Sequence, residues 1–451
     1  MSSSGKLIAP TVRFAPSPTG RIHIGNARTA VFNWLYVLKN SGRFVLRFDD
    51  TDRDRSTLQF ERDIASDLAW LGIVPDLMVR QSERFDLYRQ AADRLKEIHR
   101  LYPCYETQQE LELRRKRQLA RGAPPIYDRS ALQLTDAERL QLEAKGRRPH
   151  WRFLLESRKV GWTDLIRGPQ EIDTATLSDP VLIREDGSYL YTLPSVVDDI
   201  DLAITHVIRG EDHVVNTAVQ IQLFEALGAE PPQFAHHSLL IGADGQGLSK
   251  RLGSLSIAGM RERGIEAMSV ASVAALIGTS ESVHPVAGYE ALLQGFDLAH
   301  VSRAPARFDE EELRNLNSKL VHELPYEAVR ARLKALDADG GPQFWQVVRG
   351  NLATLNDAQH WHEVIYGAID PVVADQDFLD AARRLLPPEP WDDSTWTAWT
   401  GRLKEETGRR GKALFHPLRL ALTANEAGPE LAALLPLIGR DRVARRLAGE
   451  R

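Results

Sequence analysis

The apolar positions at the start of the chain follow two spacings. Short apolar runs at 11–15 and 43–48 predict strands, and residues 24–39 repeat apolar side chains at helical spacing. Residues 57–71 repeat the helical pattern through Phe60, Ile64, Leu68 and Leu71. Strand, helix, strand and helix at these intervals predict βαβ units and a parallel sheet.

The pattern changes between residues 100 and 190 and then returns. This stretch has a basic helix, turn residues and short strand-like runs at 151–155 and 181–184, which we interpret as an α+β insertion. The βαβ pattern resumes at residue 205, and its last strand is expected at 237–241. The sequence therefore predicts an α/β fold with a Rossmann-type parallel sheet split by an α+β insertion, followed by an all-helical C-terminal half.

Composition narrows the class of protein. The 451 residues are 43% hydrophobic and 26% charged, which is ordinary for a globular protein and excludes collagen-like and fully disordered classes. No apolar run approaches the roughly 20 residues that span a bilayer. The single cysteine, Cys104, cannot form an internal disulfide. We expect a cytoplasmic enzyme of several domains, with no membrane partner.

The stretch from Phe14 to Asn26 carries the strongest chemical information. It contains Pro16, Pro18, Gly25 and His23, and it lies where the first predicted strand passes into the first helix. In a doubly wound sheet, phosphates bind at such a helix N-terminus. A histidine there can donate hydrogen bonds to phosphate oxygens as charge develops in a transition state.

A second motif, Gly-Leu-Ser-Lys-Arg at 247–251, follows the last strand of the split sheet. Paired cations on a glycine-flanked loop suit a developing pyrophosphate. The tripeptide Ser249-Lys250-Arg251 is weak by itself, because such tripeptides are common. Its place after the histidine motif gives it weight.

These motifs resemble those of class I aminoacyl-tRNA synthetases, and specifically of bacterial glutamyl-tRNA synthetases. The resemblance extends over both ends of the chain. It is carried by RFAPSPTGRIHIGNARTA (13–30), LRFDDTDRDRS (46–56), YLYTLPSVVDDIDLAITHVIRGEDH (189–213), GLSKR (247–251) and TGRRGKALFHPLRLALT (407–423).

The resemblance implies a glutamate–tRNA ligase. Such enzymes use ATP, bound with Mg²⁺, to convert L-glutamate into glutamyl-adenylate. Pyrophosphate is released in this step. They then esterify the 3'-terminal adenosine of tRNA(Glu), and some also charge tRNA(Gln). The family suggests a monomer, and close relatives activate glutamate only when tRNA is bound.

The resemblance also assigns residues. His23 and Lys250 match the catalytic histidine and lysine of the family, with Ser249 and Arg251 beside the lysine, and Gly25 and Asp212 lie where relatives contact ATP. The glutamate-binding positions match Arg13, Ala15, Ser17, Asp49, Tyr191 and Arg209. Bidentate arginines are natural readers of a carboxylate, which agrees with the chemistry of Arg13 and Arg209.

The resemblance divides the chain into five domains. The expected ranges are 8–99 and 191–255 for the two halves of the catalytic domain, 100–190 for an insertion that binds the tRNA acceptor end, 256–325 for a helical connecting domain, and 326–451 for a helical anticodon-binding domain.

The sequence departs from the family pattern at four places. Asn26 replaces the second histidine of the first motif, Gly247 replaces the first lysine of the loop, and Asp49 replaces the usual glutamate. Several relatives hold zinc in the insertion through Cys-x-Cys and Cys-x-His pairs, of which only Cys104 is retained here. We therefore predict no metal site and no zinc.

The resemblance also implies where RNA would bind, although basic runs taken alone are typical of solvated helix faces. In the insertion the candidate phosphate contacts are Arg114, Arg115, Lys116, Arg117, Arg147 and Arg148. In the C-terminal half the candidates are Arg409, Arg410, Lys412 and the arginines after residue 440. Trp396 and Trp399 are spaced to stack on bases, although core packing is the favoured interpretation.

Three other readings stay open. A truncated paralogue would glutamylate a modified base, but it would lack the helical C-terminal half. A non-catalytic RNA-binding paralogue is favoured only by Asn26 and Gly247. A different nucleotidyltransferase using the same histidine motif would leave the C-terminal half unexplained.

Overall fold

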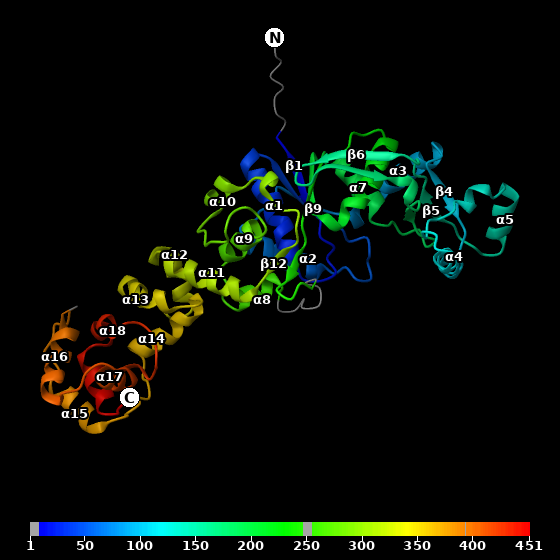
Figure 1. Cartoon of the computed structure of the whole chain (residues 1–451). Coiled ribbons are helices and arrows are strands. Elements are labelled where there is room, and N and C mark those ends of the chain that lie inside the picture. The colour runs from blue at the N-terminus through cyan, green and yellow to red at the C-terminus, as the bar shows by residue number, and fades with distance from the viewer. Residues whose placement is uncertain (1–8, 247–254, 393) are drawn as a thin grey trace, which may run out of the picture. The chain divides into compact units, whose positions relative to one another are not determined.

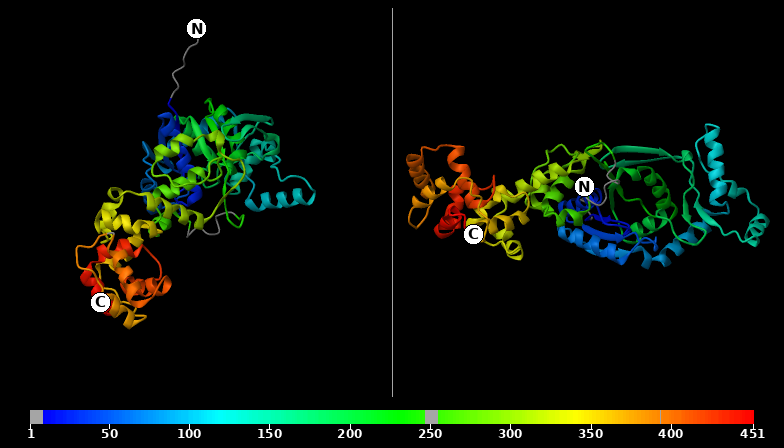
Figure 2. Two further views of the ribbon diagram at one scale, coloured as in Figure 1. Left: turned by 60° about the vertical axis from the view of Figure 1, so that its left-hand side comes forward. Right: turned by 90° about the horizontal axis from the view of Figure 1, so that it is seen from below.

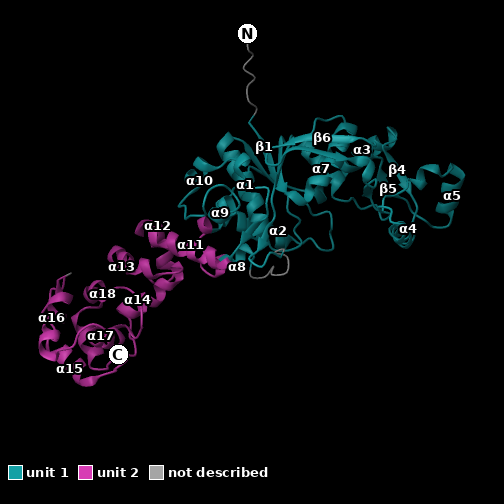
Figure 3. Ribbon diagram, viewed as in Figure 1, with its two compact units in different colours: residues 1–260, 270–309 teal, residues 261–269, 310–451 magenta. Residues whose placement is uncertain are grey.

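The computed structural model describes residues 9–246, 255–392 and 394–451 of the chain. The chain forms two compact units, which Figure 3 shows in different colours. Unit 1 contains residues 1–260 and 270–309, and unit 2 contains residues 261–269 and 310–451. The five domain ranges expected from the sequence stay predictions.

A five-stranded parallel sheet lies at the centre of unit 1 (Figure 1). Its strand order is β10-β9-β1-β2-β3, so β9 from the second half of the unit pairs directly with β1 from the first. The split sheet predicted from the sequence is thus confirmed. The strands are β1 (Thr11–Phe14), β2 (Arg43–Phe48), β3 (Leu77–Arg80), β9 (His206–Gly210) and β10 (Gln233–His237).

Helices cover the sheet because their apolar faces match its apolar strands. In β2 every residue after Arg43 is buried, as expected of a strand covered on both faces. Helix α1 (Ile24–Asn40) buries Ala27, Val31 and Leu35. The other helices on either side of the insertion are α2 (Leu58–Trp70), α3 (Phe85–Glu97), α6 (Thr192–Asp201) and α7 (Val214–Ala226).

The insertion contains two small antiparallel sheets and two exposed helices. The runs at 151–155 and 181–184 form β5 (His150–Phe153) and β8 (Val181–Ile183), and β5 lies between β8 and β4 (Leu101–Cys104) and pairs with both. Strands β6 (Lys159–Asp164) and β7 (Gly168–Asp173) form a hairpin. Both views in Figure 2 show α4 (Gln108–Ala120) and α5 (Asp136–Ala144), in cyan, apart from the blue strands of the main sheet.

Two strands differ from the sequence prediction. The strand expected at 237–241 is two strands: β10 ends at His237 in the main sheet, and β11 (Leu240–Gly242) pairs with β12 (Ala306–Phe308) in a separate sheet. A continuous apolar run does not reveal where the chain leaves a sheet. The sequence analysis also missed β3, which is at the edge of the sheet and leaves Met78 exposed.

Unit 2 is helical and has its own core, which includes the buried Trp345 and Trp399. No helix in the described part of the chain is both long enough and apolar enough to cross a membrane. Helices α8 (Ile257–Glu262), α9 (Ala267–Leu276) and α10 (Tyr289–Gly295) precede the helices of unit 2. These are α11 (Glu310–Glu323), α12 (Tyr326–Ala335), α13 (Gly341–Val348), α14 (Ala358–Tyr366), α15 (Gln376–Arg384), α16 (Thr395–Thr407), α17 (Lys412–Thr423), α18 (Leu431–Ile438) and α19 (Arg440–Leu447).

Candidate active site

A cleft of about 500 Å³ opens at the carboxyl ends of β1, β9 and β10. This is the edge of an open parallel sheet where ligands bind. Seven of the residues predicted from the sequence line the cleft: Arg13, Ala15, His23, Gly25, Tyr191, Arg209 and Asp212. The structure therefore brings together residues that are up to 199 positions apart in the sequence.

His23 is the N-cap of α1, and this contact fixes its ring. Its Nδ1 accepts a hydrogen bond from the Gly25 backbone N–H at 3.1 Å. Burial lowers the pKa of His23, so the ring is neutral at physiological pH and its single proton is on Nε2. The cleft thus receives a hydrogen-bond donor beside a helix N-terminus, which suits a phosphate.

Gly25 and Asn26 support this position. A Cβ on Gly25 would lie 2.9 Å from His23 Cε1, so a larger residue would displace the ring. Asn26, which replaces the second histidine of the family motif, accepts a hydrogen bond from the His23 backbone N–H at 3.2 Å. His23 and Asn26 form a reciprocal capping box, which gives Asn26 a structural purpose.

Arg209 is buried and retains an unneutralised charge. Its guanidinium donates to Tyr191 Oη at 3.0 Å, Thr217 Oγ1 at 2.8 Å, Gln220 Oε1 at 2.7 Å and His236 Nε2 at 3.2 Å. None of these acceptors is a carboxylate, and within the described residues Arg209 has no ion pair. Burial lowers the pKa of Arg209. A buried cation held by neutral acceptors beside an open cleft is suited to an anionic ligand.

Arg13 has a different environment. Its Nε donates to Asp199 at 3.2 Å, and both side chains are buried. Asp199 also accepts from Arg47 Nη1 at 2.8 Å, so this acid joins two arginines beneath the cleft. The neighbouring Asp198 is also ion-paired, with Arg84 at 2.7 Å.

Asp49 and Ser17 do not line the cleft. The carboxylate of Asp49 is held by Arg47 Nε at 2.7 Å and Nη2 at 3.2 Å, a bidentate pair in which Arg47 is fully buried. Ser17 is exposed in the loop after β1. Arg47 was missed by the sequence analysis, although its place two residues before Asp49 on a buried strand was a usable sign.

Other lining residues were also missed. Arg28 is fully buried on α1, and its Nε and Nη2 have no hydrogen-bond partner within the described residues. His237 ends β10, and burial together with the charge of Arg28 lowers its pKa to about 3. A histidine at a strand end is a weak sign by itself. The predicted loop residues Gly247, Ser249, Lys250 and Arg251 lie outside the described residues.

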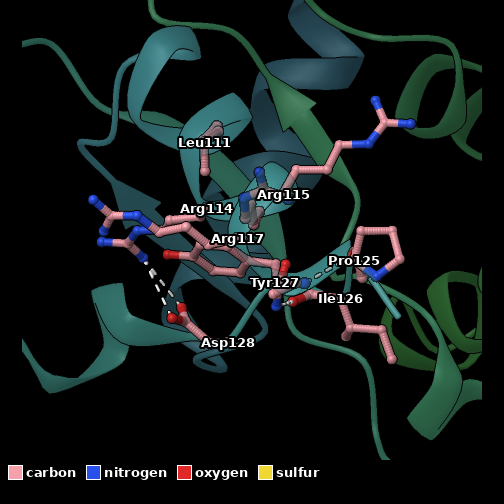
Figure 4. A pocket seen from close by; sticks show the side chains of 11 residues that line it. Leu111, Arg114, Arg115, Arg117, Pro125, Ile126, Tyr127 and Asp128 are labelled. Carbon is pink, nitrogen blue, oxygen red and sulfur yellow. Dashed lines mark hydrogen bonds and ion pairs between the residues drawn. The ribbon is translucent and has the colours of Figure 1, made fainter. Parts of the chain in front are cut away.

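The insertion has a second pocket, of about 290 Å³, between α4 and the segment 125–128 (Figure 4). The predicted RNA contacts of the insertion fall into two groups, those bound to an acid of the insertion and those that are exposed. Arg114 is bound to Asp128 at 3.2 Å and Arg147 to Glu110 at 2.8 Å. Arg117 lines the pocket and is exposed. Lys116 and Arg148 are also exposed.

The family's zinc site was tested against the residues present. Cys104, Glu106 and His150 place one potential ligand atom each within 4.8 Å of one another. However, Glu106 accepts hydrogen bonds from Tyr127, Ser130 and Arg114, so cations and hydroxyls already bind its Oε1. Burial raises the pKa of the Cys104 thiol to about 12. The described residues thus supply three donors here rather than the four of a structural zinc site, although Glu106 Oε2 and His150 Nε2 have no hydrogen-bond partner among them.

Comparison with known proteins agrees with this geometry. The family described as tRNA synthetases class I (E and Q), catalytic domain, matches residues 10–315. This chain belongs to that family of class I tRNA synthetases. The family described as anticodon binding domain matches residues 374–449 of the synthetase.

Individual relatives match along nearly the whole synthetase. Glutamate–tRNA ligase 2 of Beijerinckia indica is 61% identical, covering 98% of this chain and 99% of its own. Glutamate–tRNA ligase 1 of Maricaulis maris is 55% identical, covering 97% and 99%. A crystal structure of a glutamate tRNA ligase from Elizabethkingia meningosepticum, in complex with its amino acid, superposes with a TM-score of 0.86 at 26% identity and covers 98% of each chain.

Within unit 2, the contacts separate the predicted anticodon residues of the synthetase. Arg409 is ion-paired with Asp375 at 2.6 Å, whereas Arg410 and Lys412 are exposed. Trp399 is fully buried and donates to the Ala382 carbonyl at 2.9 Å, which confirms core packing. Among the terminal arginines, Arg446 is buried and donates to the Leu422 carbonyl at 2.7 Å, so it is a core residue.

Proposed function

We propose that this synthetase is a glutamate–tRNA ligase, which activates L-glutamate with ATP and transfers it to the 3'-terminal adenosine of tRNA(Glu). The observation that carries this proposal is the buried guanidinium of Arg209, which faces the cleft with neutral partners only. An incoming carboxylate would neutralise it, whereas a neutral side chain would leave the charge uncompensated. The names of the relatives support the same substrate.

The first step needs little from the protein beyond positioning. An oxygen of the glutamate α-carboxylate attacks the α-phosphorus of ATP, and pyrophosphate leaves. His23 would donate its Nε2 proton to a phosphate oxygen as charge develops, and the Gly25 backbone lies beside the same helix N-terminus. Ser249, Lys250, Arg251 and Asp212 are the further proposed ATP contacts, and Mg²⁺ would neutralise the phosphates.

The second step uses the tRNA itself as nucleophile. A hydroxyl of the terminal ribose attacks the carbonyl carbon of glutamyl-adenylate, and AMP leaves. No side chain of the synthetase needs to act as a nucleophile, because carboxylate and ribose supply both attacking oxygens. This is consistent with a cleft lined by arginines, histidines and backbone.

The residues proposed to bind L-glutamate would contact different groups of this ligand. Arg209 and Tyr191 would bind the side-chain carboxylate, since the Tyr191 hydroxyl accepts from Arg209 and can donate its own proton to the ligand. Arg13 would complete that site while Asp199 holds its Nε. Ala15, Ser17 and Asp49 are proposed near the amino group of the ligand. The carboxylate of Asp49 would stay paired with Arg47 while it attracts this amino group.

RNA would bind both units. In the insertion, Arg115, Lys116, Arg117 and Arg148 are proposed as phosphate contacts, because all four are exposed, whereas Arg114 and Arg147 are engaged within the protein. The anticodon would be read by unit 2, whose match to an anticodon-binding family also argues against the truncated paralogue. We propose a monomeric cytoplasmic enzyme.

The test is aminoacylation with labelled glutamate, using purified tRNA(Glu) and tRNA(Gln) in parallel. Charging of tRNA(Glu) alone supports a discriminating ligase, and charging of both supports an enzyme that also feeds a later amidation. Labelled glutamine serves as the control and should not be transferred. If neither tRNA is charged, the proposal fails and the paralogue readings take its place.

A further inference from the structure

Asp164 and His236 form a buried pair directly behind Arg209. Asp164 is the last residue of β6 in the insertion, and His236 is on β10 of the catalytic sheet. The carboxylate Oδ2 lies 2.5 Å from His236 Nδ1. On the other side of the ring, His236 Nε2 lies 3.2 Å from Arg209 Nε and 3.0 Å from Thr217 Oγ1. Neither residue of the pair lines the cleft.

The hydrogen bonds decide where the proton of His236 is. Arg209 has no acceptor atom, so His236 Nε2 must accept from Arg209 Nε–H through its lone pair. The single ring proton is then on Nδ1 and is donated to Asp164. Burial of His236 lowers its pKa, which agrees with a neutral ring.

Asp164 is fixed in the same way. Its Oδ1 accepts backbone N–H groups of Ile166 at 3.0 Å, Arg167 at 2.9 Å and His236 at 3.1 Å. Burial would raise the pKa of Asp164, but these bonds and the one from His236 outweigh burial and lower it. The carboxylate is therefore ionised, and it can only accept hydrogen bonds.

This chain of contacts sets what Arg209 offers to the cleft. Four of its five N–H groups are directed to His236, Tyr191, Thr217 and Gln220. The fifth, on Nη1, has no partner among the residues that the structure describes and can meet a ligand beside the Tyr191 hydroxyl. Asp164 holds the ring of His236 without itself touching Arg209, so the positive charge remains available.

We propose that Asp164 and His236 are positioning residues that make the synthetase select L-glutamate over L-glutamine, by holding Arg209 as a hydrogen-bond donor with an uncompensated charge. The inference rests on the proposed function. A carboxylate accepts from both the Nη1–H of Arg209 and the hydroxyl of Tyr191. A glutamine amide is neutral, and its NH₂ group would oppose these donors if it faced them.

The test variant is Asp164→Asn. Because three backbone N–H groups keep the amide oxygen at the Oδ1 position, the NH₂ group must face His236 Nδ1. This forces the ring proton onto Nε2, where it opposes Arg209 Nε–H, as a wrong tautomer does in catalytic triads. KM for glutamate and the inhibition constant of glutamine against glutamate are measured in tRNA(Glu) aminoacylation.

For Asp164→Asn we expect KM for glutamate to rise about tenfold or more, the scale of one lost charge-assisted hydrogen bond. The inhibition constant of glutamine should change little. The ratio of this inhibition constant to the KM for glutamate therefore falls by the same factor. A merely structural role would weaken both amino acids and lower kcat alike. His206→Gln is the matched control, since His206 is on neighbouring β9 and contacts Thr205 rather than Arg209.

Unchanged glutamate KM and unchanged ratio in folded Asp164→Asn would overturn the inference. If this variant does not fold, His236→Gln and His236→Phe decide instead. Gln can donate to Asp164 and accept from Arg209, so it should retain selectivity, whereas Phe should lose it; equal selectivity in both would overturn the inference. Wild-type charging with glutamate separates the two levels: without it the proposed function fails first, and with it only the positioning role is at stake.

Discussion

Arg13 and Arg209 are both buried arginines of the cleft, but within the described part of the chain only Arg13 of the two has a carboxylate partner. The sequence analysis treated them alike, as readers of a glutamate carboxylate. At the scale of single residues, the structure separates them by their acceptors. Asp199 neutralises Arg13, whereas Tyr191, Thr217 and Gln220 leave Arg209 charged. The carboxylate specificity should therefore depend most on Arg209.

Replacing Arg209 by Lys tests this at constant charge. An ammonium has three donors without the planar fork, so it cannot serve four protein acceptors and a ligand together. We expect kcat/KM for glutamate to fall by about 10²-fold or more, the scale of an unmatched buried polar site. The measurement is steady-state aminoacylation, with Arg89→Lys, at an exposed ion pair, as the control. Nearly normal activity would make Arg209 structural.

The Gly25→Ala substitution tests the position of His23. The added Cβ would lie 2.9 Å from the ring, so His23 must move and its donor leaves the phosphate position. Adenylate formation should fall by about 10²-fold, as when one transition-state donor is lost. Pyrophosphate exchange in the presence of tRNA measures this.

The matched control is Gly20→Ala in the same loop. A Cβ on Gly20 would meet nothing within 4 Å, so its activity should stay near that of the wild type. Equal activity of the two alanine variants would show that the ring of His23 is not positioned by its contact with Gly25.

At the scale of elements, local contacts hold together the part of the insertion around Cys104. The Arg114 guanidinium reaches Glu106 at 3.4 Å and Asp128 at 3.2 Å, and the Tyr127 hydroxyl donates to Glu106 at 2.8 Å. A cationic side chain thus joins β4, α4 and the segment after it. Hydrogen bonds and ion pairs can hold these elements together without a metal.

Metal analysis of the purified protein should find no stoichiometric zinc. A chelator should leave the Tm unchanged, because no metal contributes to the folding of the insertion. The comparison is a glutamyl relative that has the Cys-x-Cys and Cys-x-His pairs, whose Tm should fall. One zinc per chain would contradict the prediction. Its loss in His150→Ala would then assign it to the cluster of Cys104, Glu106 and His150.

At the scale of the whole molecule, one chain supplies two compact units with separate tasks. The cleft belongs to unit 1, and the anticodon-binding family matches unit 2. In unit 2 the charged candidates differ in what they already bind. Arg409 pairs with Asp375 and lies 4.5 Å over the ring of Phe378, whereas Arg410 is exposed. Only the second is free for a phosphate.

Arg410→Ala should raise KM for tRNA severalfold and leave KM for glutamate unchanged. Its salt dependence should weaken by about one phosphate contact. Arg409→Ala is the comparison, and it should lower the Tm by breaking the Asp375 pair and the Phe378 contact, with a smaller effect on KM for tRNA. Aminoacylation at two salt concentrations and thermal unfolding separate the variants. The reverse pattern would place the RNA contact at Arg409.

The sequence by itself determined much of this synthetase. Strong helical periodicity in residues 24–39 and buried apolar runs in 43–48 specified elements that the structure confirms as α1 and β2. The motif around His23 predicted the position of the cleft. The residues of the turn between the first strand and the first helix are neighbours in the sequence, and phosphates bind at such a turn. Edge strand β3 escaped prediction, since a partly exposed strand has no clear apolar pattern.

Only the tertiary structure decided which charges are neutralised. Asp199 lies 186 residues from Arg13, and Asp164 lies 72 residues from His236, so no spacing in the sequence connects them. Burial makes these pairings matter, because a charge removed from water depends on the groups it contacts. The sequence therefore named seven residues that line the cleft, and the packing of distant strands left Arg209 there without an ion pair among the described residues.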